Sequence, residues 1–184
     1  MARTVRTDNN VVCVGSRALH TLRSSLTRVL GEQAAERLQE AGYAGGEQIY
    51  ASFCQWLPEY AGIDDPAELD ASALGEVMSA FFEALGWGRL TVERAGGAAL
   101  TITSTNWAEA EPGAEAQLPS CHIASGLFAD FLGRLSKKSV AVMEVECRTR
   151  GEPRCKFVVG APETLESVYN ALAAGGDYQS ALPT

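Results

Sequence analysis

The sequence lacks the features that would place the protein in a membrane or in the secretory pathway. No run of about 18 apolar residues occurs among its 184 residues, so a membrane span is not expected. The N-terminal segment MARTVRTDNNVVCVG carries Arg3 and Arg6 but no apolar stretch of the kind that a secretory signal needs. Positive charge is also scarce, because 15 lysine and arginine residues face 23 acidic residues and leave a net charge of -8. Since phosphate backbones repel such a chain, no direct nucleic-acid partner is expected. The lack of a signal-like stretch predicts a cytoplasmic protein.

The cysteine count does not fit a disulfide framework. The chain has 5 cysteines, an odd number, and without an export signal they are expected to be free thiols, metal ligands or core residues. Cys13 and Cys54 lie in the apolar stretches VVCVG and YASFCQWL, which predicts that both are small buried hydrophobic residues. Cys121, Cys147 and Cys155 remain as candidates for a functional role.

The first half of the chain is patterned as helices. Apolar residues recur at helical spacing over 16–30, and the pattern ends at a glycine. A second run predicts a helix over 34–41 that ends in the loop GYAGG, and a third predicts one from Glu47 to the residue before Pro58. A strongly amphipathic run over 74–85 predicts a fourth helix.

Strand patterns begin in the second half. Apolar and polar residues alternate on both sides of the sequence AGG, which predicts a hairpin with a three-residue loop that pairs Val92 with Leu100. Residues 106–119 form an acidic segment that contains Pro and Gly, and they are expected to connect this hairpin to the next helix. A helix with Ser120 as its N-cap and a final helix over 162–173 are predicted beyond it.

The segment SVAVMEVECRTRGEPRCKFVVG is predicted to form a second β-hairpin. A turn centred on Gly151 sorts apolar and charged residues onto opposite faces of both strands. The opposed residues are then Cys147 and Cys155, Val145 and Phe157, and Met143 and Val159 on the core face, and Glu146 and Lys156 on the other.

This hairpin brings two thiols to one side, and three interpretations are open: a cross-hairpin disulfide, two buried free cysteines, or a metal site. Cys121 is the natural third ligand, because it would open a helix, and a helix N-terminus favours the thiolate. The fourth ligand stays open. Glu144 lies three residues before Cys147 and needs a β-bulge to reach the same face, whereas His122 offers a nitrogen beside Cys121.

A site with four protein ligands has no free coordination position, which predicts a structural Zn²⁺ rather than a catalytic one. Such an ion would clamp the hairpin to the helix that starts at Cys121. No catalytic residue is proposed from the sequence.

These residues resemble the 4-vinyl reductase domain family. The resemblance is closest over PSCHIASGLFADFLGRL and VAVMEVECRTRGEPRCKFVV, and VGSRALHTLRSSLTRVLG with LQEAGYAGGEQIY is similar to the family's helical lead-in. In the family, the sensor domains of phenol-responsive transcription regulators bind zinc through a Cys, a Glu and two more Cys. Their order and separation look like Cys121, Glu144, Cys147 and Cys155, so the resemblance implies Glu144 rather than His122 as the fourth ligand.

The resemblance also implies a fold, one shared with subunits of a vesicle-tethering complex. We expect an α+β domain over residues 11–174, with helices packed on one face of a short antiparallel sheet made of two hairpins. Residues 1–10 are expected to be a flexible N-terminus and residues 175–184 a C-terminal tail. Members of this fold often pair, so a homodimer is expected.

The function that the resemblance implies is non-enzymatic: a stand-alone, zinc-stabilised sensor of a small apolar or aromatic ligand, which signals through a partner protein or through rearrangement of the dimer. The aromatic residues expected to line the ligand pocket are Phe53, Trp56, Phe81, Phe82, Trp107, Phe128 and Phe131. One alternative is a tetrapyrrole-reduction accessory factor or a 4-vinyl reductase, although no dinucleotide-binding motif follows a predicted strand. Another is a structural assembly protein that binds no ligand.

Overall fold

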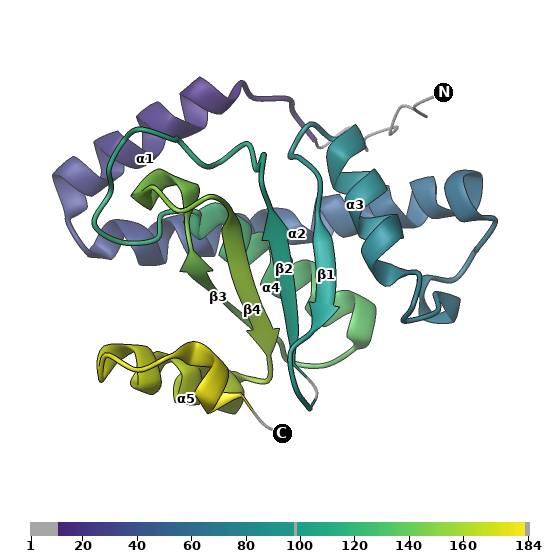
Figure 1. Cartoon of the computed structure of the whole chain (residues 1–184). Helices are drawn as coiled ribbons and strands as arrows, with labels where there is room; N and C mark the ends of the chain where they lie inside the picture. Colours follow the sequence, from purple (N-terminus) through teal and green to yellow (C-terminus); the bar gives the residue numbers. More distant parts are fainter. Residues whose placement is uncertain (1–10, 98, 183–184) are drawn as a thin grey trace.

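The computed structural model describes residues 11–97 and 99–182 (Figure 1). The predicted flexible N-terminus, residues 1–10, lies outside the described residues. The α-helices and strands, in chain order, are α1 (Ser16–Leu30), α2 (Gln33–Ala61), α3 (Leu74–Ala84), β1 (Thr91–Arg94), β2 (Leu100–Ser104), α4 (His122–Ser136), β3 (Ala141–Glu146), β4 (Cys155–Gly160) and α5 (Pro162–Ala173). Short 3-10 helices are η1 (Pro66–Glu68), η2 (Arg148–Arg150) and η3 (Tyr178–Ala181).

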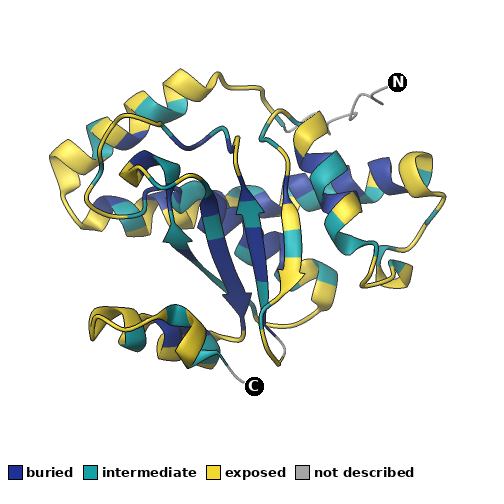
Figure 2. Cartoon of the chain, in the orientation of Figure 1, coloured by how far each residue is buried: buried dark blue, intermediate teal, exposed yellow. Residues whose placement is uncertain are grey.

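The four strands form one antiparallel sheet in the order β1-β2-β4-β3, so two hairpins lie side by side with β2 and β4 at the centre. Helices α2, α3 and α4 cover one face of this sheet, and their apolar residues share a core with Ile102 and Phe157. Figure 2 shows the buried central strands against the exposed edge strand β1. The predicted α+β class and the two hairpins are confirmed.

Helix α2 is continuous, and the predicted break at GYAGG is wrong. The glycines serve close packing instead of a turn. A Cβ atom added at Gly42 would overlap the backbone carbonyl of Ile123 in α4, and one at Gly126 in α4 would overlap the carbonyl of Gln39 in α2. The two helices therefore cross with their backbones in contact, which residues larger than glycine would prevent. The helix also passes Pro58 and ends at Gly62, whose N–H donates to the Pro58 carbonyl.

The first hairpin is shifted from its predicted register. Val92 pairs with Ile102, not with Leu100, and Ala95 donates to the carbonyl of Ala99, so the turn is centred one residue later than predicted. A shift of two residues keeps each side chain on its predicted face. Just before β1, Ser79 Oγ of α3 accepts the N–H of Leu90 at 3.0 Å, which holds the start of this edge strand to the helix.

Helix α5 lies against the face of β3 and β4 that the other helices leave open (Figure 1). Leu165 and Val168 of this helix bury Val158 of β4. The segment expected to be a tail contains η3, and Tyr178 and Leu182 pack against the same small cluster.

Two further expectations have clear outcomes. Among the described residues, no helix has the length and apolar composition needed to cross a membrane. The prediction for the two remaining cysteines is wrong, since Cys13 is exposed and Cys54 is only partly buried.

Candidate metal centre

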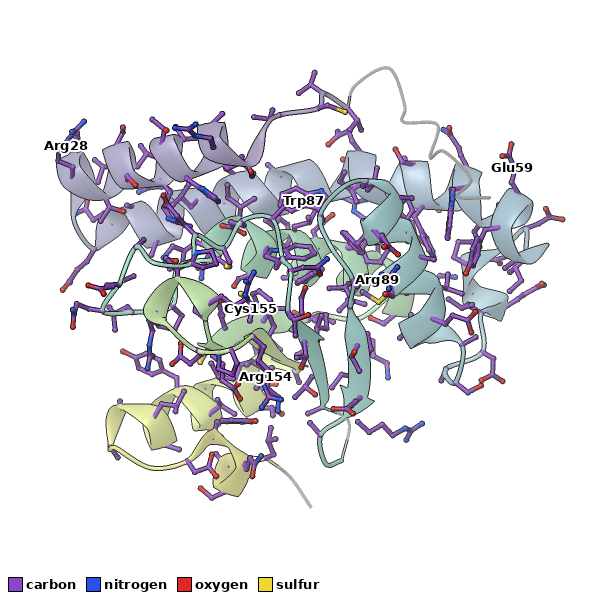
Figure 3. The ribbon with its side chains drawn as sticks, turned by 45° about the horizontal axis from the view of Figure 1, so that its top comes forward. Arg28, Glu59, Trp87, Arg89, Arg154 and Cys155 are labelled. Atoms are coloured by element: carbon purple, nitrogen blue, oxygen red, sulfur yellow. The ribbon has the colours of Figure 1, made fainter. Side chains whose placement is uncertain are left out.

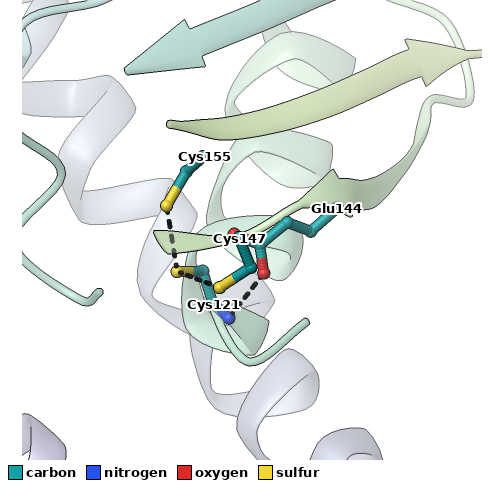
Figure 4. A group of neighbouring side chains, drawn as sticks. All are labelled: Cys121, Glu144, Cys147 and Cys155. Carbon is teal, nitrogen blue, oxygen red and sulfur yellow. Dashed lines mark hydrogen bonds between the residues drawn. The ribbon is translucent and has the colours of Figure 1, made fainter. Parts of the chain in front are cut away.

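Three cysteines and one glutamate meet where α4 begins and the β3–β4 hairpin turns (Figure 4). Cys121 is the residue before α4, Cys147 follows β3, and Cys155 opens β4. Glu144 lies within β3. The candidate ligand atoms all lie within 4.8 Å of one another, and the cluster is buried.

Glu144 reaches the cluster because of a β-bulge. Glu144 opposes Phe157 and Glu146 opposes Lys156, so Val145 is the extra residue between them. The bulge needed for ligation by Glu144 is thus confirmed. It turns Glu144 to the core face, whereas a regular strand would have left it on the outer face.

The same bulge corrects the predicted hairpin register. The pair of Glu146 and Lys156 holds, but Val145 has no opposed residue and Met143 opposes Val158 instead of Val159. Met143 and Val145 therefore pack on the α5 side, not in the main core.

The sulfur atoms are spaced as ligands of one tetrahedral ion would be. Cys121 Sγ lies 3.9 Å from Cys147 Sγ and 3.8 Å from Cys155 Sγ. Zinc–sulfur bonds of about 2.3 Å in a tetrahedron separate two sulfur atoms by about 3.8 Å. The described residues also include no disulfide, and these three cysteines are free thiols with no solvent exposure.

One oxygen of Glu144 is left for a metal ion. Its Oε2 accepts the backbone N–H of Cys121 at 2.8 Å, whereas the buried Oε1 has no hydrogen-bond partner. An unpaired buried carboxylate oxygen is costly unless something positive occupies its open side. Three thiols and one carboxylate oxygen are a donor set that suits zinc, so the residues fit the ion that the sequence predicts.

The electrostatics of the cluster also fit a cation. Hydrogen bonds from the thiols of Cys121 and Cys155 hold the pKa of Cys147 far below its ordinary value. Hydrogen bonds to Cys147 and Cys155, together with burial, raise the pKa of Cys121. Burial, with the nearby Cys147 charge, raises the pKa of Glu144 to about 9. A divalent ion would favour the ionised form of every ligand and would therefore lower the raised pKa values of Cys121 and Glu144.

His122 does not join the cluster. It is half-buried in the first turn of α4, where burial and the charge of Arg23 lower its pKa. Among the described residues, the group that could hold a metal ion contains Glu144 and not His122.

A second set of side chains supports the ligands, and most of them carry no signal that sequence reasoning could use. Ser120 Oγ lies 3.7 Å from Cys147 Sγ, and Glu152 accepts the backbone N–H of Cys147 at 2.9 Å. The prediction that Ser120 is the N-cap of α4 is wrong. The N-cap position is Cys121, and the N–H groups of Ile123 and Ala124 donate to the two carboxylate oxygens of Glu109 at 2.9 and 2.8 Å.

The aromatic residues predicted to line a pocket do come together. All seven lie in the main core, and the centroids of neighbouring rings are 5.2 to 6.2 Å apart. None of them lines the two main hollows of the described residues, which are both open to the surface. The larger, of about 790 Å³, lies between α3 and β1 and is bordered by Tyr60.

Comparison with known proteins agrees with this arrangement. Residues 101–161 match the family model of the 4-vinyl reductase domain. The predicted resemblance to this family is confirmed, and the matched segment contains all four residues of the cluster. No curated protein matches this chain.

Solved structures share the fold of this chain at low sequence identity. The phenol-responsive sensory domain of the transcription activator PoxR, solved with phenol, is 20% identical with a TM-score of 0.65 over 89% of this chain and 82% of that one. A trafficking protein particle complex subunit 3 from Naegleria fowleri, covalently bound to palmitic acid, is 16% identical with a TM-score of 0.61 over 78% and 90%. A vinyl-4-reductase family protein from Methanocaldococcus jannaschii is 14% identical with a TM-score of 0.50 over 82% and 83%. These likenesses establish the fold.

Proposed function

We propose that this protein is a zinc-stabilised, non-enzymatic module that binds a small aromatic or apolar molecule carrying an oxygen acceptor. The observation that carries the ligand is the indole nitrogen of Trp56, a donor buried in the aromatic core without a hydrogen-bond partner. Leaving such a donor unpaired costs about 1–3 kcal/mol, which a ligand oxygen would offset.

The surroundings of Trp56 suit such a ligand. Its ring stacks on Tyr60 with centroids 4.2 Å apart, and it also contacts Phe53 and Phe81 in the core. Tyr60 borders the open hollow between α3 and β1. A small molecule could therefore reach the aromatic core by displacing Tyr60.

Trp107 is a weaker candidate donor. Its N–H makes no hydrogen bond of normal geometry, but it lies close enough to Glu109 to favour the charged form of that carboxyl group, against the larger effect of burial on its pKa. Trp56 has no such neighbour among the described interactions.

The proteins that share this fold lend support. One was solved with phenol and another with covalently bound palmitic acid, so the architecture is able to accept both a small aromatic and an acyl chain. For this chain we favour the aromatic ligand, because the candidate donor lies among rings. Trp56 packs against Phe53 and Phe81, and these two rings in turn contact Phe82 and Phe131.

In this proposal the zinc ion is a structural clamp. Cys121, Cys147, Cys155 and Glu144 would fill all four positions of a tetrahedral ion and tie the start of α4 to the β3–β4 hairpin. Ligand binding would be read out in the cytoplasm by a homodimer or a partner protein, through a shift in the helices that enclose the core.

The test uses two probes that differ by one oxygen, 1-naphthol and naphthalene. At about 100 times its Kd, a bound probe adds about 2.7 kcal/mol to the free energy of unfolding. For a chain of this size, that raises Tm by about 5–11 °C. Failure of both probes, and of phenol and indole, to raise Tm would refute the ligand proposal.

Trp56→Phe is the matched variant, because it keeps an aromatic ring and removes the N–H donor. We expect it to weaken 1-naphthol about tenfold, the contribution of one hydrogen bond, and to leave naphthalene unchanged. Equal effects on the two probes would remove Trp56 as the anchoring donor.

A structural assembly protein without a ligand is the second candidate, and one observation favours it. The buried rings of the core already touch one another, as for Phe53 and Phe131 at 5.2 Å. If this candidate is correct, no probe raises Tm and native mass spectrometry finds zinc and a dimer but no co-purified small molecule.

A further inference from the structure

Helix α1 is attached to the protein in an unusual way. Amphipathic helices are normally held by a buried apolar stripe, yet the one buried residue of α1 is an arginine, Arg23. Leu22 and Val29 of the same helix are exposed. Leu19 and Leu26 are only half-buried, so the polar contacts of Arg23 form the most deeply buried attachment of α1.

Those contacts all reach one short segment of the chain between β2 and α4. Arg23 donates to the backbone carbonyl of Glu109 at 2.9 Å and to the carboxylate of Glu111 at 2.8 Å. His20 Nε2 lies 3.2 Å from the carbonyl of Ala108. We call residues 105–120 the connector; it runs beside α1 in Figure 1.

The connector is held to the core at Ala108, whose N–H donates to the Trp87 carbonyl at 2.8 Å, but the residues that bind Arg23 are fixed at two further points, and each of these adjoins the metal centre. On one side, Thr149 accepts the N–H of Glu111 through its hydroxyl and the N–H of Ala116 through its carbonyl, both at 3.0 Å. Thr149 is buried and lies two residues after Cys147.

The other fixed point is the first turn of α4. The carboxylate of Glu109 accepts the N–H groups of Ile123 and Ala124 there, directly after Cys121. The acceptors of Arg23 are thus held by two segments that carry or adjoin metal ligands, the η2 turn and the start of α4.

We propose that the metal centre controls the docking of α1. With zinc bound, the η2 turn and the start of α4 have one fixed spacing, and the connector presents both acceptors to Arg23. When the ion leaves, four buried ligands lose the charge that holds them together and both segments loosen. Arg23 then loses its partners, and α1 separates from the connector before the sheet and the α2–α4 pair unfold. This inference rests on the proposed zinc site and not on the proposed ligand.

Hydrogen–deuterium exchange on the full chain, read peptide by peptide, is the test, with native mass spectrometry reporting the zinc content of each sample. Removing zinc with a chelator should speed amide exchange in α1 by at least about tenfold while the peptides of α2 change little. Zinc loss without faster exchange in α1, or an equal rise in α1 and α2, overturns the coupling.

Two variants separate the coupling from the zinc site itself. Arg23→Met and Glu111→Gln should release α1 in the zinc-loaded protein, with one zinc ion still bound. Arg28→Met is the matched control, because Arg28 is exposed on α1 and points away from the rest of the protein (Figure 3). It should leave exchange in α1 unchanged. A chain that binds no zinc at all refutes the metal centre directly. If zinc binds but Arg23→Met leaves amide exchange in α1 unchanged, only the coupling is refuted.

Discussion

Replacing Gly126 with alanine should destabilise the protein, although alanine is the better helix former. Gly126 lies in α4, at the point where that helix crosses α2. Its Cβ atom would overlap the Gln39 carbonyl oxygen and would lie 2.7 Å from the Tyr43 backbone nitrogen, well short of the 3.4 Å at which ordinary contact begins. Both obstacles belong to the backbone of a long helix, so neither is able to rotate away as a side chain would.

The size of the effect follows from two opposing contributions. Overpacking of a well-packed interface costs about 1–3 kcal/mol, and rigid backbone contacts place this site at the upper end, near 3 kcal/mol. Alanine in place of a helical glycine contributes about 1 kcal/mol in the other direction. The net loss is about 2 kcal/mol, which lowers Tm by about 4–8 °C in a chain of this size.

Gly45→Ala is the matched control. Gly45 lies within α2, but a Cβ atom added there meets nothing within 4 Å. Only the helix-propensity gain remains, so this variant should be more stable than the parent by up to about 1 kcal/mol. The assay is thermal and urea unfolding followed by circular dichroism, on samples of equal zinc content. If Gly126→Ala is as stable as Gly45→Ala, the backbone contact between the helices is not what the structure indicates.

Two further predictions concern the metal centre and the pH dependence. Removing a supporting contact of a metal ligand weakens metal binding by about 10–100-fold, so loss of the ligand itself in Glu144→Gln should weaken Zn²⁺ binding by at least about 100-fold. The variant His122→Asn should change Zn²⁺ binding little. Competition with a chromophoric chelator measures both affinities, and the reverse order of the two variants would make His122 the fourth ligand. Burial raises the pKa of Glu109 to about 7 from its ordinary 4.5, against the opposing hydrogen bonds from Ala124 and Ile123. Since the pKa of Glu109 is raised in the folded protein, protonated Glu109 contributes fully to the free energy of unfolding below pH 4.5. This contribution is lost as the pH rises through 7, and the loss is about 3 kcal/mol. Urea unfolding between pH 5 and pH 8 should therefore find the parent losing stability relative to Glu109→Gln, and a constant difference between the two would contradict the shift.

Apolar periodicity was sufficient to predict most helices, because most of them bury one stripe of apolar side chains, although the one buried residue of α1 is Arg23. It predicted α1 and α5 with their bounds. It failed at GYAGG, because a local pattern of glycines is typical of a turn. Here a glycine is required instead by the contact between α2 and α4. Whether a glycine breaks a helix or lets another helix approach depends on the partner, and the partner of Gly42 lies far along the chain, at Ile123.

The metal centre was more predictable in composition than in geometry. Two strands of alternating residues determined where Cys147 and Cys155 could meet, but the register beyond Glu146 depended on one bulged residue, Val145. Alternation alone cannot reveal a bulge, because it assigns each residue a face by counting. The signal that located it was the resemblance to the family's zinc ligands, which implied Glu144 rather than His122 as the fourth. No comparable signal marked Glu109, since an acidic residue in an acidic connector looks solvated until the fold buries it.

The first turn of α4 is the point at which these features depend on one another. Its N–H groups meet two buried carboxylates, because Glu144 accepts from Cys121 while Glu109 accepts from Ile123 and Ala124. A helix N-terminus carries only about half a positive charge, which is too little to balance two ionised carboxylates in a buried site. Arg23 donates to the backbone carbonyl of Glu109, and its charge is paired with the carboxylate of Glu111. A divalent ion beside Glu144 would supply further positive charge and favour the ionised form of the ligands, so the metal centre and this turn would stabilise each other. Since Phe128 and Phe131 of the aromatic core project from the same helix, an ion that sets the position of its first turn would also set the shape of any ligand site.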